Sequence, residues 1–246
     1  MVMCLLSLSK KCVRENNRIN MSGVNLFISS TTFLEVPAVF RAYYMMMPKY
    51  RQAKIDRCYF SNDKRKSLLA GILLKYALKE YAAHSGDEII LTEHGKPYLK
   101  SNPEIFFNLS HSGKMVLLAL GDSEVGCDIE EMLDFDWIST AKSCFCEQEY
   151  AYIMSSTERN LQNFYRIWTL KESFLKMTGY GLNISLNSVE FCFDGANIQS
   201  IQHFGDMNYF LKTFTIGNYC CACCSVTQNL PDKLTYISDN VLKGAL

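Results

Sequence analysis

The chain has 246 residues, of which 48% are hydrophobic and 20% charged, a composition typical of folded soluble proteins that excludes global disorder. Lysine plus arginine and aspartate plus glutamate both number 25, so there is no basic field to hold a nucleic-acid backbone. No apolar run approaches the roughly 20 residues that span a bilayer. We therefore expect neither a nucleic-acid partner nor a membrane partner.

The N-terminal segment, MVMCLLSLSKKC, has some features of a secretion signal. Its lysines follow the apolar run instead of preceding it, and no small-residue cleavage site comes next. We therefore expect a cytoplasmic protein. Residues 1–20 are interpreted as a disordered lead-in, with a natural translation start at Met21 as the alternative.

Eleven cysteines are an unusually high and odd number for a disulfide scaffold, and a chain of this length can bury a core without covalent links. We therefore expect reduced thiols. The densest group, residues 220–224, has no histidine nearby and no second group at zinc-finger spacing. This group is interpreted as small apolar side chains on a buried strand.

In the first half, apolar residues recur at helical spacing over residues 63–83, with Asn62 or Asp63 available as N-cap and Gly86 beyond the end. Three strand-like runs follow, and the turn-prone Gly121-Asp122-Ser123 joins the last two. The pattern predicts a helix packed on an antiparallel sheet. The expected strands are 105–109, 115–120 and 125–129.

The second half repeats this scheme, with a helix over 163–177 that ends at Gly179. The strands expected after it are 189–193, 209–216 and 219–226, the last two joined by a turn at Gly217-Asn218. The predicted fold class is α+β, with halves at 21–125 and 126–246, each a small antiparallel sheet on a long helix. We expect a monomer whose halves pack as one body, with a ligand site in the cleft between them.

Two short segments carry paired charges. Side chains alternate along a strand, so Asp128 and Glu130 share one face of the predicted strand. Glu172 and Lys176 lie four residues apart and share one face of the predicted helix. Taken alone, each pair is more typical of a solvated surface than of an active site.

A third segment changes that interpretation. Ser110 and His111 in FFNLSHSG, together with Lys96 in GKPY, supply hydroxyl, imidazole and ammonium donors of the kind that bind phosphate oxygens. Carboxylates such as Asp128 and Glu130 suit a hard, oxygen-loving cation. The three segments together indicate a site for a magnesium-bound phosphoanhydride.

Four motifs, GKPYL, FFNLSHSG, VGCDIEE and WTLKESFLKMTGYGL, occur in this order. From about residue 45 onward the chain resembles the large, single-chain, Sfp-like 4′-phosphopantetheinyl transferases. The resemblance implies two pseudo-twofold-related halves and coenzyme A as co-substrate. It also implies transfer of the 4′-phosphopantetheine arm to a serine of an apo acyl, peptidyl or aryl carrier protein, which releases adenosine 3′,5′-bisphosphate. Such carriers serve fatty-acid, polyketide or nonribosomal peptide synthesis.

The resemblance also implies roles for individual residues. Asp128, Glu130 and Glu172 match the Mg²⁺ ligands, and Glu172 also matches the base that activates the acceptor serine. Lys176 would neutralise charge on the pyrophosphate and protonate the departing oxygen. Cys127 stands where an aliphatic residue is more usual, which a core position would tolerate. The residues that match coenzyme A contacts are Lys96, Ser110 and His111 for the phosphates, Arg51 and Lys54 for the 3′-phosphate, and Lys66 and Ser67 at the start of the first helix.

Residues 132–165 would, by the same resemblance, include the surface that docks the carrier protein. The candidate apolar anchors are Phe135, Trp137, Phe145 and Tyr150, with Lys142 placed to attract an acidic partner. The alternative is that these aromatic residues belong to the core.

Two other functions use the same residues. A magnesium-dependent phosphoanhydride hydrolase would replace the serine with water. A catalytically silent coenzyme A-binding module would need no base, and the intact set of Asp128, Glu130, Glu172 and Lys176 argues against it.

Overall fold

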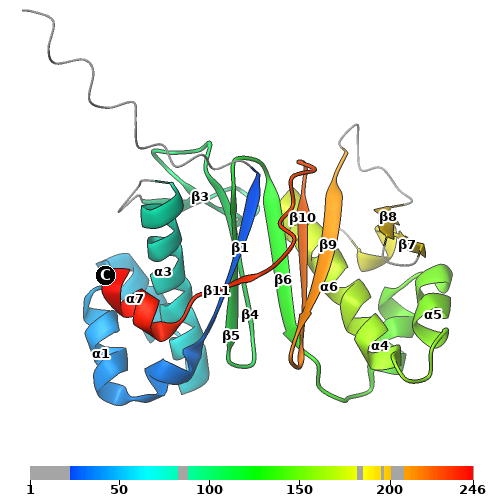
Figure 1. Ribbon diagram of the computed structural model, residues 1–246, viewed down its shortest axis with the longest axis horizontal. Coiled ribbons are helices and arrows are strands. Elements are labelled where there is room, and N and C mark those ends of the chain that lie inside the picture. The colour runs from blue at the N-terminus through cyan, green and yellow to red at the C-terminus, as the bar shows by residue number, and fades with distance from the viewer. Residues whose placement is uncertain (1–22, 83–87, 182–184, 195–196, 201–207, 246) are drawn as a thin grey trace, which may run out of the picture.

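The computed structural model describes residues 23–82, 88–181, 185–194, 197–200 and 208–245, so the predicted lead-in over residues 1–20 lies outside the described residues. Strands form the middle of the molecule and helices cover its two flanks (Figure 1). The predicted α+β class is confirmed. No helix among the described residues is both long and apolar enough to cross a membrane.

The first sheet has the strand order β11-β1-β5-β4. β1 and β4 both pair antiparallel with β5, and the short β11 pairs parallel with β1. Gly113, with φ of 51°, makes the tight turn between β4 and β5, a conformation that favours glycine. The strands are β1 (Val24–Ser30), β4 (Phe106–Ser112), β5 (Met115–Gly121) and β11 (Thr235–Tyr236).

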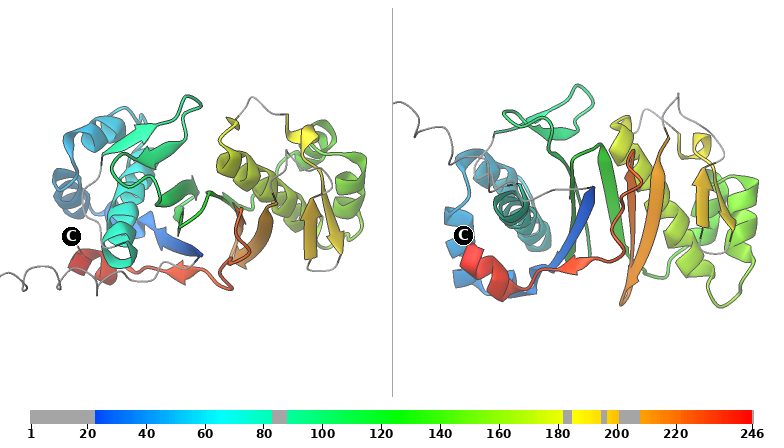
Figure 2. Two further views of the ribbon diagram at one scale, coloured as in Figure 1. Left: turned by 90° about the horizontal axis from the view of Figure 1, so that it is seen from above. Right: turned by 45° about the horizontal axis from the view of Figure 1, so that its top comes forward.

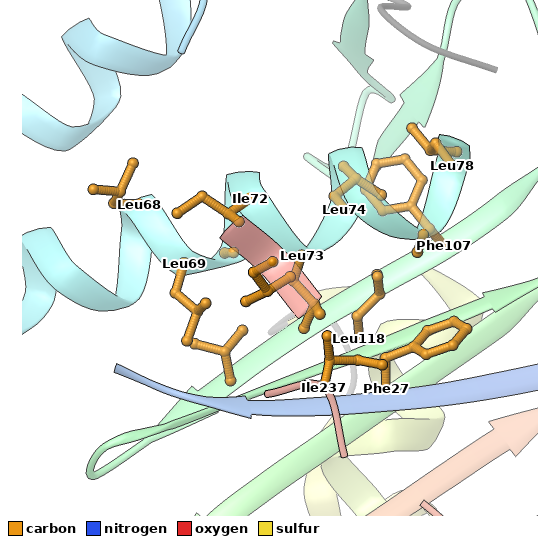
Figure 3. Close-up of a cluster of buried hydrophobic side chains, with 14 of the residues drawn as sticks. Phe27, Leu68, Leu69, Ile72, Leu73, Leu74, Leu78, Phe107, Leu118 and Ile237 are labelled. Atoms are coloured by element: carbon orange, nitrogen blue, oxygen red, sulfur yellow. The ribbon is translucent and has the colours of Figure 1, made fainter. Parts of the chain in front are cut away.

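Helix α3 (Ser61–Tyr81) covers one face of this sheet. Its leucines, Leu69 and Leu73 among them, pack with Phe27 of β1 and Leu118 of β5 in one buried cluster (Figure 3). The predicted packing of this helix on an antiparallel sheet is confirmed, and one face of the helix carries these leucines.

The predicted N-cap of this helix is wrong. Phe60 occupies the N-cap position and offers no side-chain cap. Asn62 instead donates to the Gly113 carbonyl at 3.2 Å, and Asp63 pairs with Lys66 at 3.0 Å. Neither of these polar side chains therefore caps the N-terminus of α3.

The second sheet has the order β6-β10-β9 and is entirely antiparallel. Helix α6 (Asn160–Thr178) packs against it and ends at Gly179, whose φ of 73° is left-handed, as the sequence predicted. Gly217 also has a positive φ, 54°, at the predicted turn between β9 and β10. The strands are β6 (Val125–Glu131), β9 (Phe210–Ile216) and β10 (Tyr219–Ser225).

The cysteines of β10 lie on a buried strand, as predicted. Cys221 and Cys223 pack in the cluster that contains Ile129, while Cys224 packs with Ala222 beside α6. All are free thiols. Burial raises the pKa of Cys220 to about 11, so these side chains act as small hydrophobic groups.

Smaller elements surround this frame. They are α1 (Pro37–Met45), α2 (Lys49–Asp56), α4 (Trp137–Cys144), α5 (Glu147–Met154), α7 (Asp239–Ala245), the 3₁₀ turns at Thr31–Glu35 and Leu186–Ser188, the hairpin of β2 (Ile89–Leu91) and β3 (Pro97–Leu99), and the hairpin of β7 (Phe191–Asp194) and β8 (Asn197–Ser200). The tip of the β2–β3 hairpin faces the C-terminal end of α6 (Figure 2), where the Lys96 ammonium donates to the Met177 carbonyl.

After β10 the chain returns to the first half. β11 extends the first sheet, and Ile237 and Leu242 of the following segment join the cluster around α3. The division into 21–125 and 126–246 stays a prediction, and the structure adds that this C-terminal segment packs on the other half.

The two sheets meet where β4 lies alongside β6, a contact that we call the β4–β6 seam. Side chains of β4 make its hydrogen bonds at every second residue. Asn108 accepts from the Cys127 N–H at 3.0 Å, Ser110 donates to Asp128 at 2.7 Å, and Ser112 donates to Glu130 at 2.7 Å. The seam therefore fixes the carboxylates of the second half against the first.

Gly126 lets α6 approach β6 closely. A Cβ atom at this position would overlap the Ser173 carbonyl and the backbone nitrogen of Met177. Only glycine leaves room for this contact, which brings Glu172 and Lys176 toward the strand.

Replacing Gly126 with alanine is expected to push α6 away from the sheet and to lower the free energy of unfolding by about 1–3 kcal/mol, the usual cost of overpacking. Denaturant unfolding measures the change. Gly244→Ala is the matched control, because its Cβ meets nothing within 4 Å. Equal stability of the two variants would contradict the close contact.

Candidate active site

Asp128 is the most buried carboxylate of the seam, with 2% of its surface exposed. Its Oδ1 accepts hydrogen bonds from Ser110 at 2.7 Å and from the Lys176 ammonium at 2.6 Å. Its Oδ2 is buried and has no hydrogen-bond partner among the described residues. Burying a charged carboxylate oxygen without a hydrogen-bond partner costs free energy, unless a further donor or a cation binds to it.

Glu130 and Glu172 complete an acidic cluster around Asp128. Burial raises the pKa of both side chains, and the charge of Asp128 raises both further. The Asp128 contact raises the pKa of Lys176 although burial opposes that shift. One ammonium thus faces three mutually repelling carboxylates, so the cluster favours additional positive charge.

The shared faces predicted from spacing are confirmed. Asp128 and Glu130 both accept from β4 serines, and Glu172 and Lys176 both line a cavity of about 280 Å³. This cavity lies between α6 and the tip of the β2–β3 hairpin, and Lys96 also lines it. Side chains from both halves therefore surround one small space.

Lys96 is already engaged by protein groups. Its ammonium contacts the Glu124 carboxylate and donates to the Met177 carbonyl at 2.6 Å. It links the hairpin to the start of β6 and the end of α6. No pattern in the sequence indicated Glu124 as a partner of Lys96.

His111 lies on β4, next to Ser110, and its side chain is exposed. Desolvation of the ring lowers its pKa, and the charges of Lys66 and Lys176 lower it further. His111 therefore lies within electrostatic reach of both the start of α3 and the acidic cluster.

The predicted basic contacts gather where α2 meets α3. Arg51 is buried, and its Nη2 donates to the Ser67 carbonyl at 2.8 Å. Ser67 is also buried, and its hydroxyl has no described partner. Lys54 is exposed, and desolvation together with the charge of Arg51 lowers its pKa. The structure brings these three residues together, with Lys54 the accessible one.

A buried ion pair holds α6 from the other side. Lys171 and Glu149 are both 0% exposed and lie 2.7 Å apart. Lys171 also donates to the carbonyls of Leu186 and Val189, and Glu149 accepts from the backbone of Cys146 and Phe191. Lys171 directly precedes Glu172. The signal in the sequence was a lysine at an apolar helix position, next to Leu170 and within the spacing of Ile167 and Phe174.

The four aromatic residues expected to dock a carrier protein differ in burial. Phe145 is 6% exposed and belongs to the core around Phe164, which confirms the alternative for this residue. Trp137 and Tyr150 are half-buried against the same core. Phe135 is 45% exposed, with Leu133 and Ile138 also exposed nearby in the sequence.

Comparison with known proteins identifies the family to which the chain belongs. The family model of the 4′-phosphopantetheinyl transferase superfamily matches residues 124–224, and that of the 4′-phosphopantetheinyl transferase N-terminal domain matches 35–123. The 4′-phosphopantetheinyl transferase ffp of Bacillus subtilis is 32% identical over 78% of this chain and 88% of its own length. The 4′-phosphopantetheinyl transferase Sfp of Bacillus subtilis strain 168 is 29% identical over 76% of this chain and 86% of its own length.

Other similarities cover less of the chains. The transferase psf-1 of Bacillus pumilus is 38% identical over 56% of this chain and 60% of its own. A solved holo-[acyl-carrier-protein] synthase from Thermotoga maritima aligns over 42% of this chain and 62% of its own, with a TM-score of 0.37 and 22% identity. The chain belongs to the 4′-phosphopantetheinyl transferase family.

The buried pair makes a prediction about stability. Lys171→Met removes the cation and leaves Glu149 buried without it, so the free energy of unfolding should fall by about 3–5 kcal/mol. The double variant Glu149→Gln/Lys171→Met removes both charges and should recover part of that loss. Chemical denaturation measures both. A double variant no more stable than Lys171→Met would show that the ion pair is not what holds α6.

Proposed function

We propose that this protein transfers the 4′-phosphopantetheine arm of coenzyme A to a serine of an apo carrier protein, with Mg²⁺, and releases adenosine 3′,5′-bisphosphate. The observation that carries the proposal is the acidic cluster at the β4–β6 seam, with Asp128 buried between Ser110 and Lys176. A site that transfers a phosphate group needs oxygen ligands for a metal ion and a cationic side chain close to one another.

Two features of the acidic cluster favour a magnesium ion. Asp128 keeps one buried oxygen without a partner among the described residues, and burial, then the charge of Asp128, raises the pKa of Glu130 and Glu172, which supports a place for added positive charge. No three His, Cys, Asp or Glu side chains within the described ranges lie close enough to form a ready metal site. Asp128, Glu130 and Glu172 would hold the ion, with phosphate and water as its other ligands. The ion would supply charge stabilisation for the pyrophosphate.

Glu172 is the proposed base for the acceptor serine. Its side chain lines the cavity beside Lys176, so a hydroxyl entering there can reach it. The raised pKa, caused by burial and then by Asp128, brings its proton affinity closer to the operating pH. A glutamate in this position can take the serine proton as the new phosphoester bond forms.

Lys176 is the proposed partner of the leaving group. Its ammonium donates to Asp128 and, at 3.0 Å, to Ser110, and its side chain lines the cavity. It can therefore meet the charge that develops on the departing phosphate oxygen and deliver a proton to it.

The remaining cations are proposed to bind coenzyme A. Lys96, Ser110 and His111 would contact its phosphates, and Lys54 with Arg51 and Ser67 would contact the 3′-phosphate. The supporting observations are the exposure of Lys54 and His111 and the coupling of His111 to Lys66 and Lys176. Lys96 would have to share its ammonium between Glu124 and a phosphate.

The proposed carrier surface includes the exposed side chains of Leu133, Phe135 and Ile138, and Lys142 lies four residues after Ile138 on α4 and so shares its helix face. Exposed apolar side chains beside a cation suit an acidic partner. The monomeric state, the cytoplasmic location and the lack of nucleic-acid and membrane partners stay predictions.

The experiment that tests the function is intact-protein mass spectrometry of apo carrier proteins incubated with coenzyme A, Mg²⁺ and this protein. We expect the carrier to gain the mass of one phosphopantetheine group, and to gain nothing when EDTA replaces Mg²⁺. Breakdown of coenzyme A without any modified carrier would instead favour the hydrolase.

Glu172→Gln keeps the size of the side chain but removes the base and one metal charge. We expect turnover to fall by about 10² to 10⁴-fold, the usual contribution of a general base. Steady-state transfer to an apo carrier measures it, with thermal unfolding as the check on folding. Near-normal turnover would remove Glu172 from the mechanism.

Lys176→Ala tests whether Lys176 takes part in the reaction or only forms a surface ion pair. We expect turnover to fall while the Michaelis constant for coenzyme A changes less, because the ammonium would act mainly in the transition state. Lys176→Arg should recover part of the loss, since charge returns but guanidinium is a poor proton donor. An alanine variant with wild-type turnover would leave Lys176 no role beyond its contact with Asp128.

Dephospho-coenzyme A, which lacks the 3′-phosphate, tests the basic contacts. Lys54→Ala should raise the Michaelis constant for coenzyme A and leave that for dephospho-coenzyme A nearly unchanged. Lys49→Ala, an exposed lysine on the same helix, is the control. Equal penalties for both substrates would place the 3′-phosphate elsewhere.

A further inference from the structure

A cavity of about 520 Å³ lies between α2, α3 and the β2–β3 hairpin. It is larger than the cavity beside Glu172, and none of the three carboxylates of the acidic cluster lines it. Its volume falls within the range of about 300–1,000 Å³ that is typical of small-molecule sites. We call it the α2–α3 cavity.

The walls of the α2–α3 cavity are mostly apolar. Leu74 and Leu78 of α3 form one side, Ile89 and Leu99 of the hairpin form another, and Met47 lies before α2. All but Ile89 are buried, so the cavity reaches into the protein instead of lying on its surface. An aliphatic chain placed there would lose contact with water, which favours binding.

Positive charge outweighs negative charge around this space. Arg51 and Lys75 both line it, and Lys75 makes no ion pair with any residue in the described ranges. Glu88 is the one acidic lining residue in the described part of the chain, and its carboxylate already pairs with Lys100 at 2.8 Å. The unbalanced charge at the cavity is therefore cationic.

Arg51 adds a second, independent observation. Its side chain is more than nine-tenths buried, with 8% of the residue exposed, and its Nε has no hydrogen-bond partner. Its Nη2 donates to a neutral carbonyl, and no carboxylate among the described residues lies within 4 Å of the guanidinium. A buried cation without a counter-ion is costly, so the structure favours an anion beside it.

We propose that the α2–α3 cavity binds a small amphipathic anion, an aliphatic carboxylate of medium chain length. The chain would lie between the leucines of α3 and Ile89, and the carboxylate would lie near Lys75 and Arg51. The phosphates of coenzyme A share the anionic group but not the aliphatic chain. Arg51 is also a proposed contact of the 3′-phosphate, so the test is made without coenzyme A. Because decanoate binding needs neither a carrier protein nor transfer activity, its failure and the failure of the proposed function are distinguishable.

The experiment is a calorimetric titration of the full chain with decanoate, without coenzyme A. We expect saturable binding of one decanoate per chain. Decanol, which has the chain without the charge, and inorganic phosphate, which has the charge without the chain, should each bind at least tenfold more weakly. If decanol binds as tightly as decanoate, the proposed contact of the carboxylate with Lys75 and Arg51 is overturned. If phosphate binds as tightly as decanoate, the proposed contact of the aliphatic chain with the apolar walls is overturned.

Two variants locate the site. Lys75→Glu reverses a charge at the cavity, and Ile89→Trp fills part of its volume, so each should weaken decanoate binding at least tenfold. The matched controls are Lys79→Glu, one turn further along α3, and Leu91→Trp, two residues along β2. Both control residues are exposed and do not line the cavity, so wild-type binding is expected.

Thermal unfolding and transfer activity serve as checks on the variants, because neither Lys75 nor Ile89 belongs to the proposed catalytic or coenzyme A-binding residues. If Ile89→Trp does not fold, the Lys75→Glu and Lys79→Glu pair still decides the result. The proposal is overturned if wild type shows no saturable binding up to about 1 mM decanoate. Equal binding by Lys75→Glu and Lys79→Glu overturns it as well.

Discussion

The structure depends on how the carboxylate of Asp128 is held inside the protein. A carboxylate that is 2% exposed is tolerated only when donors and positive charge surround it. Ser110 supplies a hydroxyl from the first sheet, and Lys176 supplies an ammonium from α6. Because the two donors come from different halves, satisfying this one group aligns the halves and brings the residues of the candidate site together.

The packing of α6 makes that alignment possible. Gly126 allows the helix to approach β6, and the buried Lys171–Glu149 pair joins it to α5 on another side. Glu172 follows Lys171 directly, so the helix turn that carries the proposed base is held by contacts outside the cavity. Pre-organisation of this kind places catalytic groups before the substrates bind.

Local periodicity in the sequence was enough to predict several features. Alternation along β6 put Asp128 and Glu130 on one face, four-residue spacing paired Glu172 with Lys176, and Gly179 ended α6 as expected. Features that depend on partners distant in the sequence were not predictable. The return of β11 to the first sheet and the contact of Lys96 with Glu124 both depend on tertiary packing, which no local pattern encodes.

The most direct test of this account is calorimetric binding of coenzyme A to Asp128→Asn, with and without Mg²⁺. Asparagine keeps the shape of the side chain and an oxygen that can accept from Lys176, but it removes the charge that the account assigns to the metal. We predict that Mg²⁺ strengthens coenzyme A binding to the wild-type protein and that the variant, still folded, loses this enhancement. Unchanged Mg²⁺-dependent affinity in Asp128→Asn would contradict the central role given to this carboxylate.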